Sequence, residues 1–323
     1  MAKKIFITRR IPENGIQMLR QKGFEVVVND EDRPLSKVEL KDKLVEGGYD
    51  GVISLLTDVV DGEVMDVAPT VKIFANYAIG FNNFDLEGAK KRDVVLTNTP
   101  GGGADRVAEH TWALILALTC RVVEADKFVR EGKYVGWDPM IFHGTKLSGK
   151  MLGIIGTGRI GADVVHRALH GFNMKVVYFD IIRNKDLEDK YGAVFMETPE
   201  EVLKISDIVS VHVPLTPQTR HLINGERLKL MKPTAFLVNT ARGPIVDEKA
   251  LYGALKSGVI AGAGLDVFED EPKLYPGLST LPNVVLTPHI ASATKEAREE
   301  MSAIAAQNII AFFETGKPLN PVV

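Results

Sequence analysis

Short apolar runs alternate along the chain with segments in which apolar residues recur at helical spacing. The first half contains the runs KIFITRR, FEVVVND, DGVISLL, VKIFANYA and VVLTNTP, and stretches such as ENGIQMLRQKG, KVELKDKLVEG and LEGAKKRD lie between them. Strand and helix in alternation are typical of a parallel sheet that helices cover on both faces. The pattern predicts one α/β unit that ends near Pro100.

A second alternating series begins at MLGIIG and predicts a second α/β unit. It continues through MKVVYFD, AVFME, DIVSVHV, TAFLVNT, VIAGAGLDVF and NVVLTPH. Between the two series, residues 105–131 carry apolar side chains near helical spacing, and Gly132 follows as a stop signal. We predict one long helix there, which either connects two domains or belongs to a core. The fold class is therefore α/β, with two doubly wound parallel sheets.

Composition narrows the function classes. The 323 residues are 45% hydrophobic and 25% charged, which is ordinary for a globular chain of about two domains. Lys and Arg number 39 against 42 Asp and Glu, a net charge of −3, so we expect neither nucleic acid nor an anionic membrane as a partner. No apolar run approaches the roughly 20 residues that span a bilayer, and the N-terminal segment lacks the apolar stretch of a signal peptide.

The single cysteine, Cys120, excludes an intramolecular disulfide and a cysteine-based zinc site. One cysteine in a chain of this length agrees with a reducing compartment, and we expect a cytoplasmic protein without a bound metal. Because Cys120 lies in the apolar stretch 112–120, we expect its thiol to be packed rather than reactive.

A dinucleotide fingerprint stands in LGIIGTGRIG, where Gly156, Gly158 and Gly161 follow an apolar strand and open a helix. The next strand ends in Asp180, about 20 residues beyond the last glycine, where an acid that binds the adenosine ribose is expected. A carboxylate there repels a 2'-phosphate, so we expect NAD(H) in preference to NADP(H). Arg183 leaves an alternative open: it could accept a phosphate if its loop turned inward, or it could be a solvated surface residue.

Three polar groups follow later apolar strands, at the sheet edge where open α/β sheets bind ligands. Arg242 follows Asn239, an acidic cluster precedes Pro272, and His289 ends NVVLTPH. A guanidinium pairs bidentately with a substrate carboxylate, a histidine transfers an alcohol proton, and an acid orients that histidine. Beside a dinucleotide site, these residue types indicate hydride transfer.

Several longer segments carry a family resemblance over essentially the full length. They are ANYAIGFNNFD, VVLTNTPGG, VAEHTWALILAL, LGIIGTGRIG, SDIVSVHVPLTPQTRHLI, MKPTAFLVNTARGPIVDEKAL, AGAGLDVFEDEP and LTPHIASAT. Together they resemble the D-isomer-specific 2-hydroxyacid dehydrogenase family, and most closely its glyoxylate/hydroxypyruvate reductase branch. The resemblance implies a discontinuous substrate domain, residues 1–100 plus 291–323, a Rossmann-like NAD-binding domain, residues 101–290, and an active site in the cleft between them.

The resemblance also implies roles for individual residues. The catalytic trio is Arg242, Glu271 and His289, and Glu271 is chosen among three acids because it directly precedes the proline of EDEP. The implied cofactor contacts are Gly156, Gly158, Arg159, Ile160, Gly161, Asp180, Val213, Pro214, Thr219, Thr240 and Asp266. The implied substrate contacts are Leu55, Tyr77, Ala78, Ile79, Gly80, Arg242 and His289; ordinary packing is the alternative for Leu55, Leu56 and Tyr77, and a simple glycine turn for residues 78–80.

The implied reaction is the reversible reduction of glyoxylate or hydroxypyruvate by NADH, with His289 as general acid and base. Phosphoglycerate dehydrogenase or another D-2-hydroxyacid dehydrogenase is the enzymatic alternative, although a phosphate would need further basic residues. An NAD-sensing corepressor is the non-enzymatic alternative, but the chain has neither a basic patch nor a long disordered tail.

Two further features concern assembly and cofactor contact. Trp137, Met140 and Phe142 lie in the otherwise polar loop YVGWDPMIFHG, which resembles a loop inserted by a dimer partner, so we expect a homodimer. His143 and His212 lack a catalytic setting and are interpreted as structural. Where relatives commonly have Gly-Val-Leu-Thr-Asp, residues 101–105 are Gly-Gly-Gly-Ala-Asp, so Ala104 lacks a hydroxyl often found beside the nicotinamide.

Overall fold

The computed structural model describes residues 2–101 and 103–322, which form two compact units. Unit 1 comprises residues 1–103 with 293–323, and unit 2 comprises residues 104–292. The unusual stretch at residues 101–104 is therefore described only in part, because Gly102 lies outside the described residues.

Unit 1 is built on a five-stranded parallel sheet with the order β2-β1-β3-β4-β5. The strands are β1 (Lys4–Ile7), β2 (Glu25–Val28), β3 (Gly51–Leu55), β4 (Ile73–Tyr77) and β5 (Val95–Thr97). The helices are α1 (Glu13–Gln21), α2 (Lys37–Gly47), α3 (Gly62–Asp66), α4 (Leu86–Arg92) and α12 (Lys295–Thr315).

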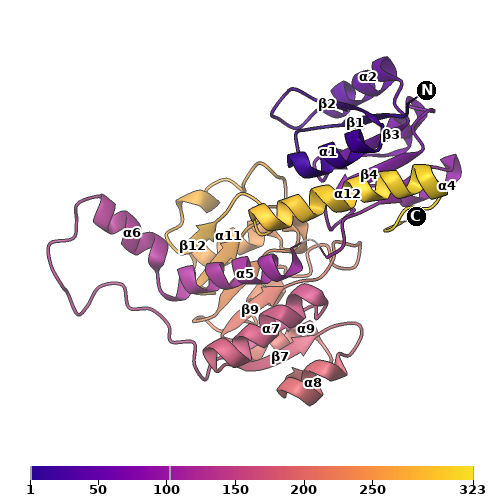
Figure 1. Ribbon diagram of the computed structural model, residues 1–323. Helices are drawn as coiled ribbons and strands as arrows, with labels where there is room; N and C mark the ends of the chain where they lie inside the picture. The colour runs from indigo at the N-terminus through magenta and orange to yellow at the C-terminus, as the bar shows by residue number, and fades with distance from the viewer. Residues whose placement is uncertain (1, 102, 323) are drawn as a thin grey trace. The chain divides into compact units, whose positions relative to one another are not determined.

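Helices cover both faces of this sheet. Along β1, Phe6 packs in a core cluster with residues of α2 and α3, whereas Ile5 and Ile7 pack in another cluster with residues of α1 and α12. This division follows from the alternation of side chains along a strand. The last helix, α12, lies along the first helix, α1, so the two ends of the chain share one core (Figure 1).

Unit 2 contains a seven-stranded parallel sheet with the order β12-β11-β10-β9-β6-β7-β8. Its strands are β6 (Met151–Ile155), β7 (Lys175–Phe179), β8 (Val194–Phe195), β9 (Ile208–Val211), β10 (Phe236–Asn239), β11 (Gly262–Leu265) and β12 (Val284–Leu286). Its helices are α5 (Ala104–Thr119), α6 (Val122–Arg130), α7 (Arg159–Phe172), α8 (Lys185–Tyr191), α9 (Pro199–Ile205), α10 (Gly225–Leu228) and α11 (Glu248–Lys256), with 3-10 turns at Gly243–Ile245 and Leu278–Thr280.

The second sheet is also covered on both faces. Ile154 packs in the core cluster of α5 and α7, while its neighbour Ile155 packs in the cluster of α9, α10 and α11. The strand order reverses between β6 and β9, because the chain builds β6, β7 and β8 outward and then returns to the other side of β6. The predicted α/β fold with two doubly wound parallel sheets is confirmed. The described residues contain no helix of sufficient length and apolarity to span a membrane.

The single long helix predicted over residues 105–131 is wrong. The chain forms α5, which packs in the core, and then α6, which has no buried residue. One backbone angle and one hydrogen bond explain the break. Arg121 has a φ of 55°, in the left-handed region, and the carbonyl of Thr119 accepts a hydrogen bond from the backbone N–H of Thr145 at 2.8 Å. Cys120 lies at this break and is exposed, so the prediction of a packed thiol is also wrong.

Candidate active site

The turn between β6 and α7 carries the glycine fingerprint. Gly156 has a φ of 97°, and a side chain there would meet the backbone of His212 at 2.7 Å, so glycine is required. Gly158 caps α7, and a Cβ added to it would meet no atom within 4 Å. The backbone at the N-terminus of α7 thus faces open space, where its N–H groups and the helix dipole favour an anion.

A cavity of about 1150 Å³ opens at this turn. It lies at the carboxyl ends of β6, β7 and β9, beside the point where the strand order reverses, which is where doubly wound sheets bind dinucleotides. Among the residues expected to contact a cofactor, it is lined by Gly156, Gly158, Asp180, Val213, Pro214 and Thr219.

Asp180 is fixed at the end of β7. Its Oδ2 atom accepts hydrogen bonds from the N–H of Thr157 at 2.6 Å and from the Thr157 hydroxyl at 3.0 Å, and its Oδ1 accepts from the N–H of Ile182 at 3.3 Å. The carboxylate is therefore held against the glycine turn. A dinucleotide that places its pyrophosphate at Gly158 would bring its adenosine ribose toward such an acid.

Arg183 lines the same cavity but is engaged elsewhere. Its Nε donates to Oε1 of Glu188 at 2.7 Å, and its Nη2 donates to Oε2 at 2.6 Å. The Tyr178 hydroxyl donates to Oε1 of the same carboxylate at 2.6 Å. The guanidinium lies 5.3 Å from the centre of the Phe195 ring. Arg183 is therefore a solvated surface residue, 55% exposed, that is ion-paired with Glu188 rather than turned inward as a phosphate ligand.

At the other strand ends, His289 and Glu271 form a pair. Nδ1 of His289 lies 2.8 Å from Oε2 of Glu271, and Oε1 of Glu271 accepts the N–H of Phe268 at 3.0 Å. Burial opposes the charge on Glu271, but its hydrogen bond to His289, the charge of that ring and that of Arg242 together lower the pKa of Glu271. Because a carboxylate can only accept, Nδ1 carries a hydrogen, and Nε2 is the atom that can exchange a proton.

Arg242 follows β10 and is placed by a tight turn. The Asn239 side chain donates to the carbonyl of Arg242 at 2.9 Å, and the next residue, Gly243, packs so closely on Phe268 that a Cβ would lie 1.8 Å from its carbonyl oxygen. Burial lowers the pKa of Arg242, and the negative charge of Glu271 opposes that shift. The turn thus brings Arg242 within the electrostatic influence of the His289–Glu271 pair.

The backbone at His289 is held in an unusual conformation by Asp266. His289 has a φ of 54°, and its N–H donates to the carbonyl of Asp266 at 2.8 Å. The buried Asp266 carboxylate accepts the N–H groups of Ile290 and Ala291 at 2.9 and 2.8 Å. These hydrogen bonds together maintain a conformation that a non-glycine residue rarely adopts.

Sequence reasoning missed two side chains that complete this network. The Thr287 hydroxyl donates to Asp266 at 2.6 Å, and Nε2 of His110 lies 3.0 Å from that hydroxyl. Since the hydroxyl proton points to Asp266, the His110 ring donates to Thr287. The signal for His110 is its position in VAEHTWALILAL, a polar side chain within an otherwise apolar helical stretch; Thr287 has no comparable signal.

The remaining expected residues of unit 2 lie elsewhere. Thr240 is buried, and its hydroxyl lies 2.9 Å from that of Thr111 on α5. Arg159, Ile160 and Gly161 begin α7 and do not line the described cavity. His212 is partly buried and does line the cavity, with Nε2 2.8 Å from the Ser210 hydroxyl. The exposed His143 contacts the carbonyl of Pro139 at 2.7 Å.

In unit 1, the turn after β4 is rigidly built. The carbonyls of Ala78, Ile79 and Gly80 accept hydrogen bonds from Thr99 N–H at 3.0 Å, from the Asn98 side chain at 2.7 Å and from the Asn76 side chain at 2.9 Å. These bonds fix the orientation of all three peptide groups.

The two apolar residues expected near the substrate differ in exposure. Tyr77 is 5% exposed, and its hydroxyl donates to the carbonyl of Arg298 at 2.9 Å, whereas Leu55 is partly exposed. Packing within unit 1 therefore buries most of the Tyr77 side chain.

Among residues 2–101 and 103–322, His, Cys, Asp and Glu side chains form no group of three or more that could hold a metal ion. The open glycine turn, the positioned acid and the cavity at the strand reversal instead fit a dinucleotide. The fold and this site define a nicotinamide-dinucleotide-binding protein of the dehydrogenase type.

Comparison with known proteins gives the family. Residues 112–291 match the family described as D-isomer specific 2-hydroxyacid dehydrogenase, NAD binding domain. A glyoxylate reductase of Pyrococcus furiosus is 50% identical over 316 residues, 97% of this chain and 93% of the relative; one of Thermococcus litoralis is 48% identical over 326 residues, 100% of this chain and 97% of the relative. The chain belongs to the D-isomer-specific 2-hydroxyacid dehydrogenase family.

Solved structures agree with this assignment. The TT0316 protein of Thermus thermophilus superposes with a TM-score of 0.92 at 43% identity, covering 99% of this chain and 100% of that chain. The NADPH-dependent glyoxylate/hydroxypyruvate reductase SMc04462 of Sinorhizobium meliloti, in complex with NADP and malonate, has a TM-score of 0.86 at 31% identity, covering 100% of this chain and 97% of that chain.

Proposed function

We propose that this enzyme reduces a small 2-oxo acid, glyoxylate or hydroxypyruvate, to the corresponding 2-hydroxy acid. The observation that carries the proposal is the His289–Glu271 pair, which leaves Nε2 of His289 as the proton-exchanging atom, while the charge of the same Glu271 acts on Arg242. The similarity to proteins named glyoxylate reductase supports this choice of substrate.

Bound NADH supplies the hydride for the carbonyl carbon of the substrate. His289, in its imidazolium form, holds a proton on Nε2 and donates it to the oxygen that becomes the alcohol. Glu271 orients the ring through Nδ1 and stabilises its positive charge. In the oxidative direction the same nitrogen accepts the proton.

Arg242 in unit 2 presents a guanidinium suited to bidentate pairing with a substrate carboxylate. In unit 1, we assign carboxylate binding to the N–H groups of the turn at Ala78, Ile79 and Gly80. The fixed carbonyls of that turn support this role, because a rigid turn binds an anion without losing further conformational freedom. Leu55 would contact the short side chain of the substrate.

We further propose that NAD(H) is preferred over NADP(H). Asp180 places a carboxylate where a 2'-phosphate would lie, and Arg183, the nearby cation, is already paired with Glu188. The relative from Sinorhizobium meliloti is NADPH-dependent, so cofactor choice varies within the family and must be measured for this chain.

The test is oxidation of NADH by the purified protein with glyoxylate, hydroxypyruvate, pyruvate, 2-ketogluconate and phosphohydroxypyruvate. We expect the highest kcat/KM with glyoxylate or hydroxypyruvate. Preference for phosphohydroxypyruvate would instead indicate a phosphoglycerate dehydrogenase. Protein that binds NADH yet turns over none of these acids would contradict the proposal and favour a cofactor-sensing binding role.

We also propose a homodimer that forms through the segment after α5. The helix α6 buries none of its residues, and Val122, Val123 and Val129 are each at least half exposed. In the loop that follows, Trp137 is 84% exposed and Met140 is 74% exposed. A nine-residue helix with an uncovered apolar side gains little stability alone, so a second copy is the expected cover.

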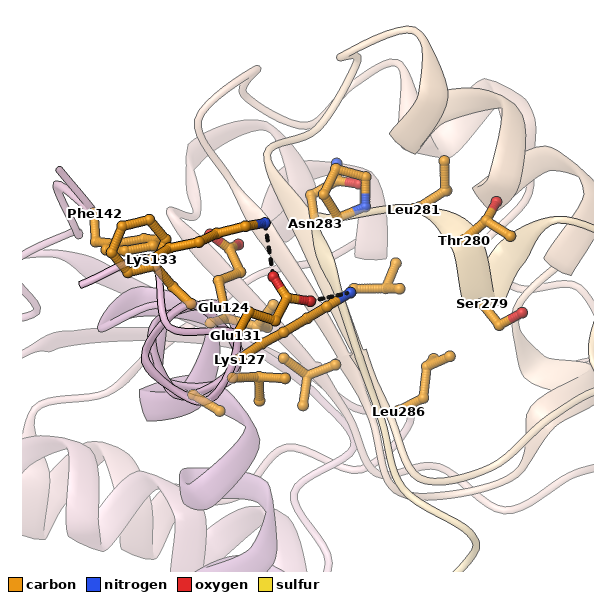
Figure 2. A pocket seen from close by; sticks show the side chains of 17 residues that line it. Glu124, Lys127, Glu131, Lys133, Phe142, Ser279, Thr280, Leu281, Asn283 and Leu286 are labelled. Carbon is orange, nitrogen blue, oxygen red and sulfur yellow. Dashed lines mark ion pairs between the residues drawn. The ribbon is translucent and has the colours of Figure 1, made fainter. Parts of the chain in front are cut away.

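A groove of about 570 Å³ lies beside α6 and could receive the same segment of the second copy (Figure 2). Its walls are the side chains of α6 and Phe142 on one side and residues 279–286 on the other. Within it, Glu131 pairs with Lys127 at 3.7 Å and with Lys133 at 2.7 Å, which leaves the apolar side chains as the surface to be covered.

Sedimentation equilibrium tests the dimer. The wild-type protein is expected at twice the chain mass, and Trp137→Ser combined with Val129→Ser is expected to shift it toward the monomer. Val194→Ser, which changes an exposed valine on β8, is the matched control. A wild-type monomer at assay concentration would rule out the dimer.

Finally, we propose a cytoplasmic location. The only cysteine, Cys120, is exposed, and an unpaired exposed thiol agrees with a reducing compartment. Cell fractionation with an antibody against the protein tests this proposal.

A further inference from the structure

We propose that Glu188 sets the cofactor preference of this enzyme by engaging Arg183 in an ion pair, so that its guanidinium is not available to a 2'-phosphate. The inference rests on the proposed preference for NAD(H). It assigns a specificity-determining role to a residue of α8 that does not itself line the cavity described above.

Arg183 and Glu188 form a bidentate ion pair. Both carboxylate oxygens of Glu188 accept from the guanidinium, at 2.7 and 2.6 Å, and the Glu188 side chain is only 17% exposed. Bidentate pairs of this kind are among the stronger hydrogen-bonded ion pairs. Arg183 is therefore held by a defined partner rather than moving freely over the cavity.

Tyr178 also fixes the Glu188 carboxylate. Its hydroxyl donates to Glu188 at 2.6 Å and accepts the N–H of Asn184, the N-cap of α8, at 2.9 Å. The hydrogen bonds from Arg183 and then Tyr178 lower the pKa of Glu188 to about 2, and burial together with the bond to Glu188 raises the pKa of Tyr178 to about 12. Glu188 is thus charged at neutral pH, where its hydrogen bonds from Arg183 and Tyr178 hold it in place.

The position of Arg183 explains why this matters for cofactor choice. It stands three residues after Asp180 and lines the cavity with it. A guanidinium in that loop is the group that a 2'-phosphate would recruit. While Glu188 engages it, a 2'-phosphate meets the Asp180 carboxylate without a free guanidinium from Arg183. Lys185 also lines the cavity and is the same in every variant compared below.

The chain offers a matched control. Arg227 also lines the cavity, and it pairs with Glu200 of α9 through Nε at 2.8 Å and Nη2 at 2.6 Å. Glu200→Gln and Glu188→Gln remove the same charge from a similar ion pair. Only Glu188→Gln weakens the pairing of Arg183. The side-chain oxygen of the new glutamine can still accept a hydrogen bond from the Tyr178 hydroxyl.

The experiment is calorimetric titration of ADP and of 2',5'-ADP into the wild-type protein, Glu188→Gln, Glu200→Gln and the double variant Glu188→Gln/Arg183→Leu. In Glu188→Gln, the affinity for 2',5'-ADP is expected to rise about tenfold or more, the range of one charge-assisted hydrogen bond. The affinity for ADP should change by no more than about twofold, since nothing that binds the diphosphate is altered. The ratio of kcat/KM for NADPH to that for NADH should rise in parallel.

Three results would overturn the role of Glu188: no gain in Glu188→Gln, an equal gain in Glu200→Gln, or a gain that survives in the double variant. The first would show that Arg183 does not reach the phosphate, and the second that net charge alone is responsible. A wild-type protein whose kcat/KM with NADPH equals that with NADH would overturn the NAD(H) preference itself, together with this inference. Preference for NADH in the wild type with an unresponsive Glu188→Gln would overturn only the latter.

Discussion

His289 and Glu271 are joined through Nδ1 and Oε2 at 2.8 Å, and this contact decides which ring nitrogen is available for chemistry. The carboxylate accepts a hydrogen bond from Nδ1–H, so Nε2 alone gains and loses a proton. Backbone bonds from Asp266 hold the same histidine at a φ of 54°. The proton transfer that we propose for His289 would therefore depend on both the side-chain pair and the turn that carries it.

Replacing His289 by glutamine removes the exchangeable proton while keeping a polar side chain. We expect kcat for 2-oxo acid reduction to fall by about 10² or more, the usual contribution of a general acid. NADH binding, measured by fluorescence titration, should be nearly unchanged. Near-normal turnover would contradict the assignment of His289.

Replacing Glu271 by glutamine removes the counter-charge of the imidazolium. Reduction needs the protonated ring, and without the carboxylate that form is less favoured, so activity should be lost at a lower pH than in the wild type. At neutral pH we expect kcat/KM to fall about tenfold or more. The measurement is the pH profile of kcat/KM, and a profile with an unmoved alkaline limb would argue against this role.

Replacing Asp266 by asparagine leaves a single acceptor oxygen on this side chain. The N–H groups of Ile290 and Ala291 each bond to a different oxygen of the carboxylate, so one of them loses its acceptor. We expect the free energy of unfolding to fall by about 1–3 kcal/mol and kcat to fall with it, because the backbone of His289 loses its restraint. Asp207→Asn is the control, since Asp207 accepts from Met151 N–H at 2.9 Å and from Lys232 at 3.0 Å on the opposite edge of the strands. It should destabilise the protein without the same loss of kcat.

The pH dependence of stability should reveal His212. Burial lowers the pKa of His212 below its usual value, so the unfolded chain takes up a proton there before the folded chain does. Its contribution to stability is fully present above about pH 6.5 and is lost as pH falls below that value, by up to about 1.4 kcal/mol per pH unit. Urea unfolding between about pH 7 and about pH 5 should show a flatter slope in His212→Gln than in the wild type. Equal slopes would contradict the prediction.

The sequence indicated much of the fold because the relevant signals are local. The period of apolar residues distinguishes strands from helices, and the strand ends are where Asp180, Arg242 and His289 stand. The helix break at Arg121 was not predictable in this way, because a hydrogen bond from Thr145 to Thr119 accompanies it, and those residues are distant in sequence.

In the candidate site, too, local sequence patterns were predictable and contacts between distant parts of the chain were not. The glycine fingerprint is a local pattern, whereas the contact of His110 with Thr287 joins α5 to the strand end before His289. The pairing of Arg183 with Glu188 likewise depends on how α8 folds back on β7, which decides between the two roles that the sequence left open for Arg183.

The packing of α12 on α1 has a consequence for synthesis of the chain. The sheet face bearing Ile5, Ile7 and Ile53 leaves the ribosome early, but the helix that shields it is translated only after the whole of unit 2. The second unit can complete its core first, while α1 alone covers this apolar face of the first unit. N-terminal domains usually fold first during translation, but here unit 2 can finish folding before unit 1. We expect the nascent chain to be most prone to aggregation in the interval before residues 295–315 emerge.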